Sequence, residues 1–143
     1  MTKNGGVVMV TFIPSFVSAE NAKWGKELES KMQGISTTAE MEALEAAHEK
    51  LHGPAPHATL AQVADHIEHV AKVAGHDHVG IGSDFWGAPP MPDGLEDVSR
   101  FPYLFAELVR RGWSDDDLTK LAGGNIIRTL AAAEAVATRL QQE

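Results

Sequence analysis

The stretch that decides the fold runs from His78 to Pro102 and reads HVGIGSDFWGAPPMPDGLEDVSRFP. Its first part, Val79 to Ser83, has the short apolar composition of a buried strand. Asp84 follows this strand directly, and a Gly/Pro-rich loop comes next. In parallel α/β proteins the chemistry lies where strands end and loops begin. Position alone therefore makes Asp84 a candidate functional residue, and the alternative is an aspartate that caps its own loop through an Asx turn.

A second apolar run, Val7 to Ile13, predicts another strand, one covered on both faces. The segments between and after the two strands have helical patterns, so the class is α/β with a parallel strand pair. Two parallel strands cannot cover their own edges and faces, and a complete (β/α)8 barrel needs about 250 residues. The chain is therefore expected to be the C-terminal segment of a larger α/β unit.

The predicted helices divide the chain of 143 residues into two parts. Residues 19–57 are rich in Glu, Lys and Ala and predict a solvated helical insertion, while residues 58–143 hold the last helix–strand unit and the closing helices. Capping residues precede the helices: Ser18, Thr37 with Glu40, Thr59 with Gln62, Ser114 with Asp117, and Asn125.

Composition excludes several functional classes. The net charge of -8 argues against a binder of nucleic acid or anionic lipid, each of which requires a basic face. The absence of cysteine excludes a disulfide framework and thiolate chemistry, and it fits a protein of the reducing cytoplasm. Neither a signal peptide nor a membrane-spanning segment is predicted.

Residues 48–52, HEKLH, match the HExxH pattern in which two histidines bind zinc and the glutamate activates water. The context favours a solvated helix face instead. The helix is expected to end at Gly53-Pro54, Lys50 adds a like charge, and the longer metzincin spacing is absent. A zincin-type protease using His48, Glu49 and His52 remains an alternative.

Other histidines have weaker claims. His76, Asp77 and His78 form an HDH cluster that resembles a metal pattern, but they precede the second strand and so lie at its N-terminal end, away from the catalytic edge. His66 and His69 flank the apolar stripe of a helix, where histidines are usually solvent-facing or hydrogen-bonded.

The loop after Asp84 offers a possible pocket wall. Trp86 and the segment 87–94, GAPPMPDG, could border a substrate, or could form a stiff surface loop. Glu96 and Asp97 are expected to cap the next helix or to pair with Arg100.

Four segments together resemble the C-terminal part of the membrane (renal-type) dipeptidases: ATLAQVADHIEHVAKVAG, HVGIGSDFWG, MPDGLEDVSRFPYLFAELVRRGWS and KLAGGNIIRTLAAAE. GGVVMVTFIPSFVS is similar to the preceding strand of that family. The resemblance implies a (β/α)8 barrel whose seventh and eighth strands lie in this chain. It also implies a pair of bridged zinc ions and hydrolysis of dipeptides by a metal-activated hydroxide.

By the same resemblance, Asp84 is the catalytic and substrate-binding residue, which holds the substrate amino group and assists proton transfer. The family's zinc ligands belong to sequence before the matched region, so no metal ligand is assigned here and the chain alone is expected to be inactive. Many relatives have Asp-Phe-Asp-Gly where this chain has Asp84-Phe85-Trp86-Gly87, which suggests a changed pocket wall. The competing hypothesis is a non-catalytic fragment that is stabilised by self-association.

Overall fold

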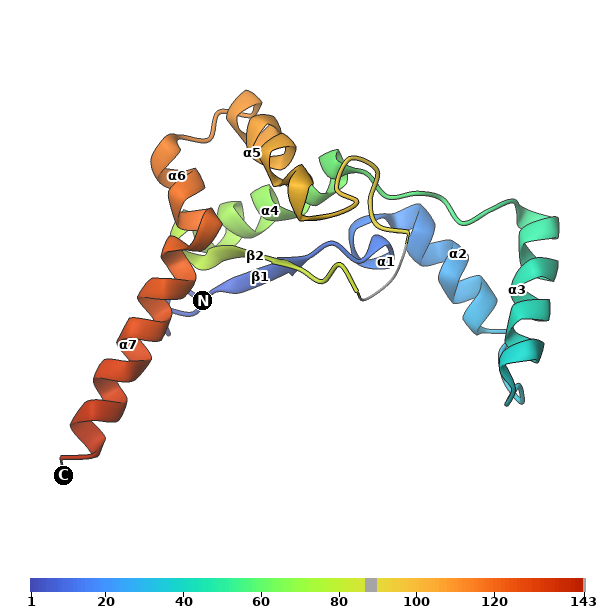
Figure 1. Ribbon diagram of the computed structural model, residues 1–143, viewed down its shortest axis with the longest axis horizontal. Helices are drawn as coiled ribbons and strands as arrows, with labels where there is room; N and C mark the ends of the chain where they lie inside the picture. The colour runs from blue at the N-terminus through green and yellow to red at the C-terminus, as the bar shows by residue number, and fades with distance from the viewer. Residues whose placement is uncertain (87–89, 143) are drawn as a thin grey trace.

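The computed structural model describes residues 1–86 and 90–142 and shows a mixed α/β chain that is mostly helical (Figure 1). In chain order the elements are β1 (Val8–Thr11), α1 (Pro14–Val17), α2 (Ala19–Glu29), α3 (Thr38–His52), α4 (Leu60–Ala74), the 3-10 turn His76–His78, β2 (Val79–Ser83), the 3-10 turn Val98–Arg100, α5 (Phe101–Arg110), α6 (Asp115–Thr119), a kinked segment Lys120–Gly124 and α7 (Asn125–Leu140).

The two strands form a parallel pair, as the sequence predicts. Val8 lies opposite Val79 and Thr11 lies opposite Ser83, with an irregularity in register between Val10 and Thr11. Parallel pairing requires a long connection, and here the connection contains α1 to α4. Because the strands are parallel, their carboxyl ends lie at the same edge of the sheet.

One face of the sheet is covered and the other is not. Helix α4 packs against both strands and buries Val63, Ala64, Ile67 and Ala71. On strand β1, Val10 is buried but Met9 is 39% exposed. The prediction that this strand is covered on both faces is wrong for the chain as described, because no described element packs over the Met9 side.

The core lies between the strands, α4 and the C-terminal helices. Its fully buried side chains include Phe12 and Val79 from the sheet and its edge, and Leu104 and Leu108 from α5. Arg111 fastens α5 to α4: its guanidinium donates to Asp65 at 2.6 Å and to Glu68 at 2.7 Å. Apolar burial and this charged cluster together hold α4 and α5 in place.

The predicted caps are confirmed with one exception. Ser18 caps α2, and three complete capping boxes open α3, α4 and α6. Asn125 is the exception, because it is the first residue of α7 rather than its cap. Its buried amide donates to the carbonyl of His76 at 2.6 Å and to that of Val79 at 2.8 Å. The side chain thus satisfies backbone groups beside β2 instead of those of its own helix.

Helices α2 and α3 form an arm that projects from the rest of the molecule, on the opposite side from α7 (Figure 1). Two hydrogen bonds join α2 to the segment that follows α3: Asn21 donates to the Pro56 carbonyl at 2.8 Å, and the Trp24 indole donates to that of Gly53 at 3.1 Å. The helical character predicted for 19–57 is confirmed. No described helix is long and apolar enough to cross a membrane.

Candidate functional site

Asp84 lies at the carboxyl tip of β2, where the sequence places it, and its side chain is exposed. The end of the strand is held from both sides. The Phe12 amide donates to the Ser83 carbonyl at 2.8 Å, and the Asp84 amide donates to the Gly82 carbonyl at 2.8 Å. The chain therefore turns sharply at Asp84, and its carboxylate stands at the edge where both parallel strands end.

The backbone at this turn has an unusual conformation. Ser83 and Asp84 have φ angles of 52° and 62°, and they are the two non-glycine residues with positive φ among those described. Such angles are unfavourable for residues with a Cβ, and they persist at sites where the surrounding structure imposes them. The conformation distinguishes Asp84 from an ordinary loop residue, and no sequence pattern announces it.

Close approach of the two strands explains Gly82, whereas at Gly80 the nearest atom is the flexible end of a side chain. A Cβ at Gly82 would lie 3.0 Å from the Met9 carbonyl oxygen, and one at Gly80 would lie 2.6 Å from the Met9 sulfur. After the turn, the Phe85 ring packs edge-on against Phe12 with centroids 5.8 Å apart. The strand and this aromatic contact thus fix the backbone on both sides of Asp84.

Trp86, two residues after Asp84, is open to solvent. The Trp86 side chain is 98% exposed and contributes nothing to the core. Residues 87–89 of the predicted pocket wall lie outside the described part of the chain. Farther along, Asp97 caps the 3-10 turn through the Ser99 amide at 2.8 Å, and Glu96 pairs with Arg100 at 3.1 Å, as the sequence predicts.

The HDH cluster lies at the other end of β2, and its groups are already engaged. His78 Nδ1 lies 2.7 Å from the Gly6 carbonyl oxygen, and His76 Nδ1 lies 3.5 Å from an Asp117 oxygen. Asp77 pairs with Lys120 at 3.1 Å, and hydrogen bonding to that ammonium lowers the pKa of the Asp77 carboxyl. These contacts support the interpretation of the cluster as structural.

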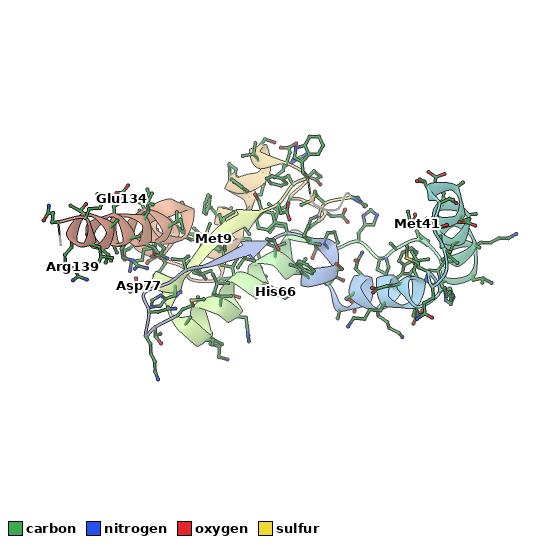
Figure 2. The ribbon with its side chains drawn as sticks, turned by 90° about the horizontal axis from the view of Figure 1, so that it is seen from below. Met9, Met41, His66, Asp77, Glu134 and Arg139 are labelled. Atoms are coloured by element: carbon green, nitrogen blue, oxygen red, sulfur yellow. The ribbon has the colours of Figure 1, made fainter. Side chains whose placement is uncertain are left out.

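His66 and His69 are both exposed on α4, as expected for residues beside an apolar stripe. Figure 2 labels His66 on this helix, beneath the strand pair.

The HEKLH segment differs from the sequence interpretation at His48 alone, since residues 49–52 are exposed as predicted. It forms the last turns of α3, but His48 is only 1% exposed rather than part of a solvated face. One ligand-capable atom from each of Glu27, His48 and His52 lies within 4.8 Å of the other two. Glu27 comes from α2, so sequence spacing could not associate it with the histidine pair. The Lys31 ammonium, in the connection after α2, lies 3.1 Å from His48 Nδ1.

Comparisons with known proteins agree with this architecture. The family model described as membrane dipeptidase (peptidase family M19) matches residues 1–143. Dipeptidase aclJ of Aspergillus oryzae is 53% identical over 83 residues, which are 58% of this chain and 20% of that protein. Dipeptidase verJ of Clonostachys rogersoniana is 45% identical over 84 residues, which are 59% of this chain and 22% of that protein.

Two solved structures have a similar fold. The probable dipeptidase PvdM from Pseudomonas aeruginosa superposes with a TM-score of 0.67 at 28% identity, over 89% of this chain and 37% of that one. Dipeptidase AC, described as a metallopeptidase of the same family, gives a TM-score of 0.58 at 25% identity, over 87% of this chain and 27% of that one. The chain therefore belongs to the membrane dipeptidase family of metallopeptidases. The matched region spans about a fifth of the curated relatives.

Proposed function

We propose that this chain forms the last two strands and the closing helices of a (β/α)8 metallo-dipeptidase, with Asp84 at its substrate site. The observation that carries the proposal is the position of Asp84, on a conformationally strained turn at the carboxyl tip of a parallel strand. Family membership supplies the reaction, which is hydrolysis of a dipeptide. The exposed Met9 side of the sheet is where neighbouring parts of a barrel would pack.

The chemistry proposed for Asp84 follows from its charge and its position. An exposed carboxylate at the mouth of a barrel can bind the amino group of a dipeptide by a charge-assisted hydrogen bond. The same carboxylate can hold a proton and deliver it to the amine that leaves when the peptide bond breaks. Binding and proton delivery both require a fixed position, and the aromatic contact of Phe85 with Phe12 supplies it.

The proposal assigns no metal ligand to the residues around Asp84. Among residues 1–86 and 90–142, one group of at least three candidate ligands is close enough to hold an ion, and it consists of Glu27, His48 and His52. The acids and histidines nearest to β2 in sequence, His76 to His78, lie at the opposite end of the strand and are engaged there. We therefore assign no residue of this chain to the zinc pair that the family resemblance implies.

Trp86 is proposed to border the substrate. Its exposed indole follows Asp84 by two residues, and an apolar ring at that position would favour substrates with an apolar side chain. A carboxylate at the same position, as in the Asp-Phe-Asp-Gly pattern, would favour polar or cationic groups.

The test uses the complete polypeptide that contains this chain. Asp84→Asn should reduce kcat for dipeptides by about 10²- to 10⁴-fold, the usual contribution of a positioned acid or base. The zinc content and the thermal midpoint should remain unchanged. Asp115→Asn, a substitution of an exposed acid at the start of α6, is the matched control and should keep full activity. Equal activity of the two variants would refute the assignment of Asp84.

A second candidate, a non-catalytic chain that associates with itself, is favoured by one observation. Helix α7 carries a series of exposed apolar side chains: Ile126, Ile127, Leu130, Val136 and Leu140. These side chains and the Met9 face could be covered by a second copy instead of by the rest of a barrel. Sedimentation of the 143-residue chain separates the two, because a monomer that unfolds cooperatively would exclude self-association.

A further inference from the structure

The arm formed by α2 and α3 has almost no apolar core. Helix α2 has no buried residue, and the one buried residue of α3 is His48. Two helices of 11 and 15 residues are marginal on their own, and packing normally stabilises such helices in proteins. A polar group thus occupies the position where an apolar side chain would be expected to hold the two helices together.

The surroundings of His48 come from both helices. The Trp24 ring of α2 meets the imidazole edge-on, with centroids 4.8 Å apart, and the His52 ring lies 4.3 Å away, one turn along α3. Glu27 of α2 completes the cluster, which we call the arm cluster: Glu27, His48 and His52. Three chemically suitable ligands from two helices therefore converge on one point.

His48 has an unpartnered polar atom. Its Nδ1 lies 3.1 Å from the Lys31 ammonium, so Nδ1 accepts a hydrogen bond and the ring proton lies on Nε2. The Nε2 atom is fully buried and has no hydrogen-bond partner. Burial and, after it, the nearby Lys31 charge lower the pKa of the His48 imidazole.

We propose that the arm cluster of Glu27, His48 and His52 binds a divalent transition-metal cation, zinc by its donor set, which cross-links α2 to α3. The proposal does not depend on the dipeptidase function, because the cluster lies outside the site at the tip of β2. Coordination of the cation by His48 Nε2 would displace the proton that has no hydrogen-bond acceptor and would form a metal–nitrogen bond in its place. Lys31 is exposed and free to turn into solvent when Nδ1 becomes a donor.

The geometry suits zinc. Zinc takes two imidazole nitrogens and a carboxylate oxygen at about 2.0–2.2 Å in a tetrahedron, which separates the ligand atoms by about 3.4 Å. The three atoms already lie within 4.8 Å of one another, so modest side-chain rotations bring them to this spacing. Two histidines at i and i+4 on one helix face are a recurrent zinc pair, and water can fill the fourth position.

The site differs from that of a zincin protease. In the protease pattern, the glutamate between the histidines acts on metal-bound water. Here Glu49 is exposed and outside the cluster, and the third ligand, Glu27, comes from another helix. Substitution of Glu27 should therefore affect metal binding in the arm cluster, whereas substitution of Glu49 should matter only for the zincin pattern.

The experiment is a zinc titration of the untagged 143-residue chain by calorimetry, combined with hydrogen exchange of residues 19–57. We expect one saturable equivalent of zinc and exchange in α2 and α3 that is slowed at least about tenfold, because a ligand that binds only the folded arm stabilises it. Glu27→Gln, which preserves size, should weaken zinc binding by about tenfold or more.

Two variants serve as matched controls. Glu49→Gln should bind zinc as the parent chain does, and Lys31→Met should bind more tightly, since it removes an ammonium that competes for His48. Equal zinc affinity of Glu27→Gln and the parent would overturn the proposal, as would unchanged exchange in the arm. A loss in Glu49→Gln as large as that in Glu27→Gln would also overturn it and would favour the protease pattern.

Discussion

The two halves of this molecule are stabilised in different ways. The strand pair with α4 and α5 surrounds side chains that are completely buried, among them Ile67, Leu104 and Leu108. The arm of α2 and α3 has complete helix caps but buries a single histidine. Well-formed helices therefore do not imply a core, and the stability of the arm depends on its helix caps and on the arm cluster. The arm should therefore open locally at a lower free energy than the strand pair.

The largest difference is expected from apolar truncation. Leu108→Ala removes a fully buried side chain and should lower the free energy of unfolding by about 2–5 kcal/mol. Leu51→Ala is the matched change in the arm, where the side chain is 77% exposed, and should change it by less than about 0.5 kcal/mol. Denaturant unfolding of both variants measures this. Similar losses of unfolding free energy in the two variants would show that Leu51 contributes to the hydrophobic core.

Replacing glycine by alanine should destabilise the strand pair and stabilise the arm. A Cβ at Gly82 would press on the Met9 carbonyl, so Gly82→Ala should cost about 1–3 kcal/mol. Gly25 lies within α2 and has no foreign heavy atom within 4 Å of its would-be Cβ. Gly25→Ala should therefore stabilise the arm by about 0.5–1 kcal/mol, because alanine is the better helix former. Thermal unfolding and hydrogen exchange report the two effects.

Loss of a helix cap should destabilise the whole molecule in one half and a single helix in the other. Thr59 and Thr37 both complete capping boxes, and replacement of either by alanine should cost about 1 kcal/mol. For Thr59→Ala the loss should appear in global unfolding, since α4 is part of the core. For Thr37→Ala it should appear as faster amide exchange within α3 alone. A global effect of Thr37→Ala would contradict the separation of the two halves.

Acid should lower the stability of the α4 and α5 region, by less than the substitutions above. Hydrogen bonds from Arg110 and Arg111 lower the pKa of Glu107 from 4.5 to about 2. A depressed folded-state pKa contributes stability that is present above pH 4.5 and is lost as the pH falls towards 2. Urea unfolding midpoints between pH 5 and 2 should therefore fall less steeply in Glu107→Gln than in the parent chain. Parallel slopes would exclude this contribution.

Local patterns predicted most of the elements. Capping boxes at Thr37, Thr59 and Ser114 located three helix starts, because these residues act on amides within one turn. The position of Asp84 at a strand end also followed from chain order. The (β/α)8 barrel and the role of the segment 19–57 as an insertion remain predictions.

What the sequence could not reveal depends on contacts distant along the chain. Glu27 reaches the histidines of α3 only through the fold of the arm, and Asn125 serves carbonyls some 46 residues before it. The positive φ of Ser83 occurs at the strand end, where the Phe12 amide donates to the Ser83 carbonyl, and serine as a residue type does not predict it. Tertiary hydrogen bonds overrode local capping tendency at Asn125.

The turn at Ser83 and Asp84 also bears on how this protein can be improved. Glycine tolerates positive φ better than serine or aspartate does, so a screen for heat resistance would enrich glycine at both positions. At position 83 such a hit would be harmless, whereas at position 84 the more durable protein would have lost the acid that we assign to the reaction. Laboratory evolution for thermostability alone would thus favour glycine at position 84 and reduce the rate of catalysis.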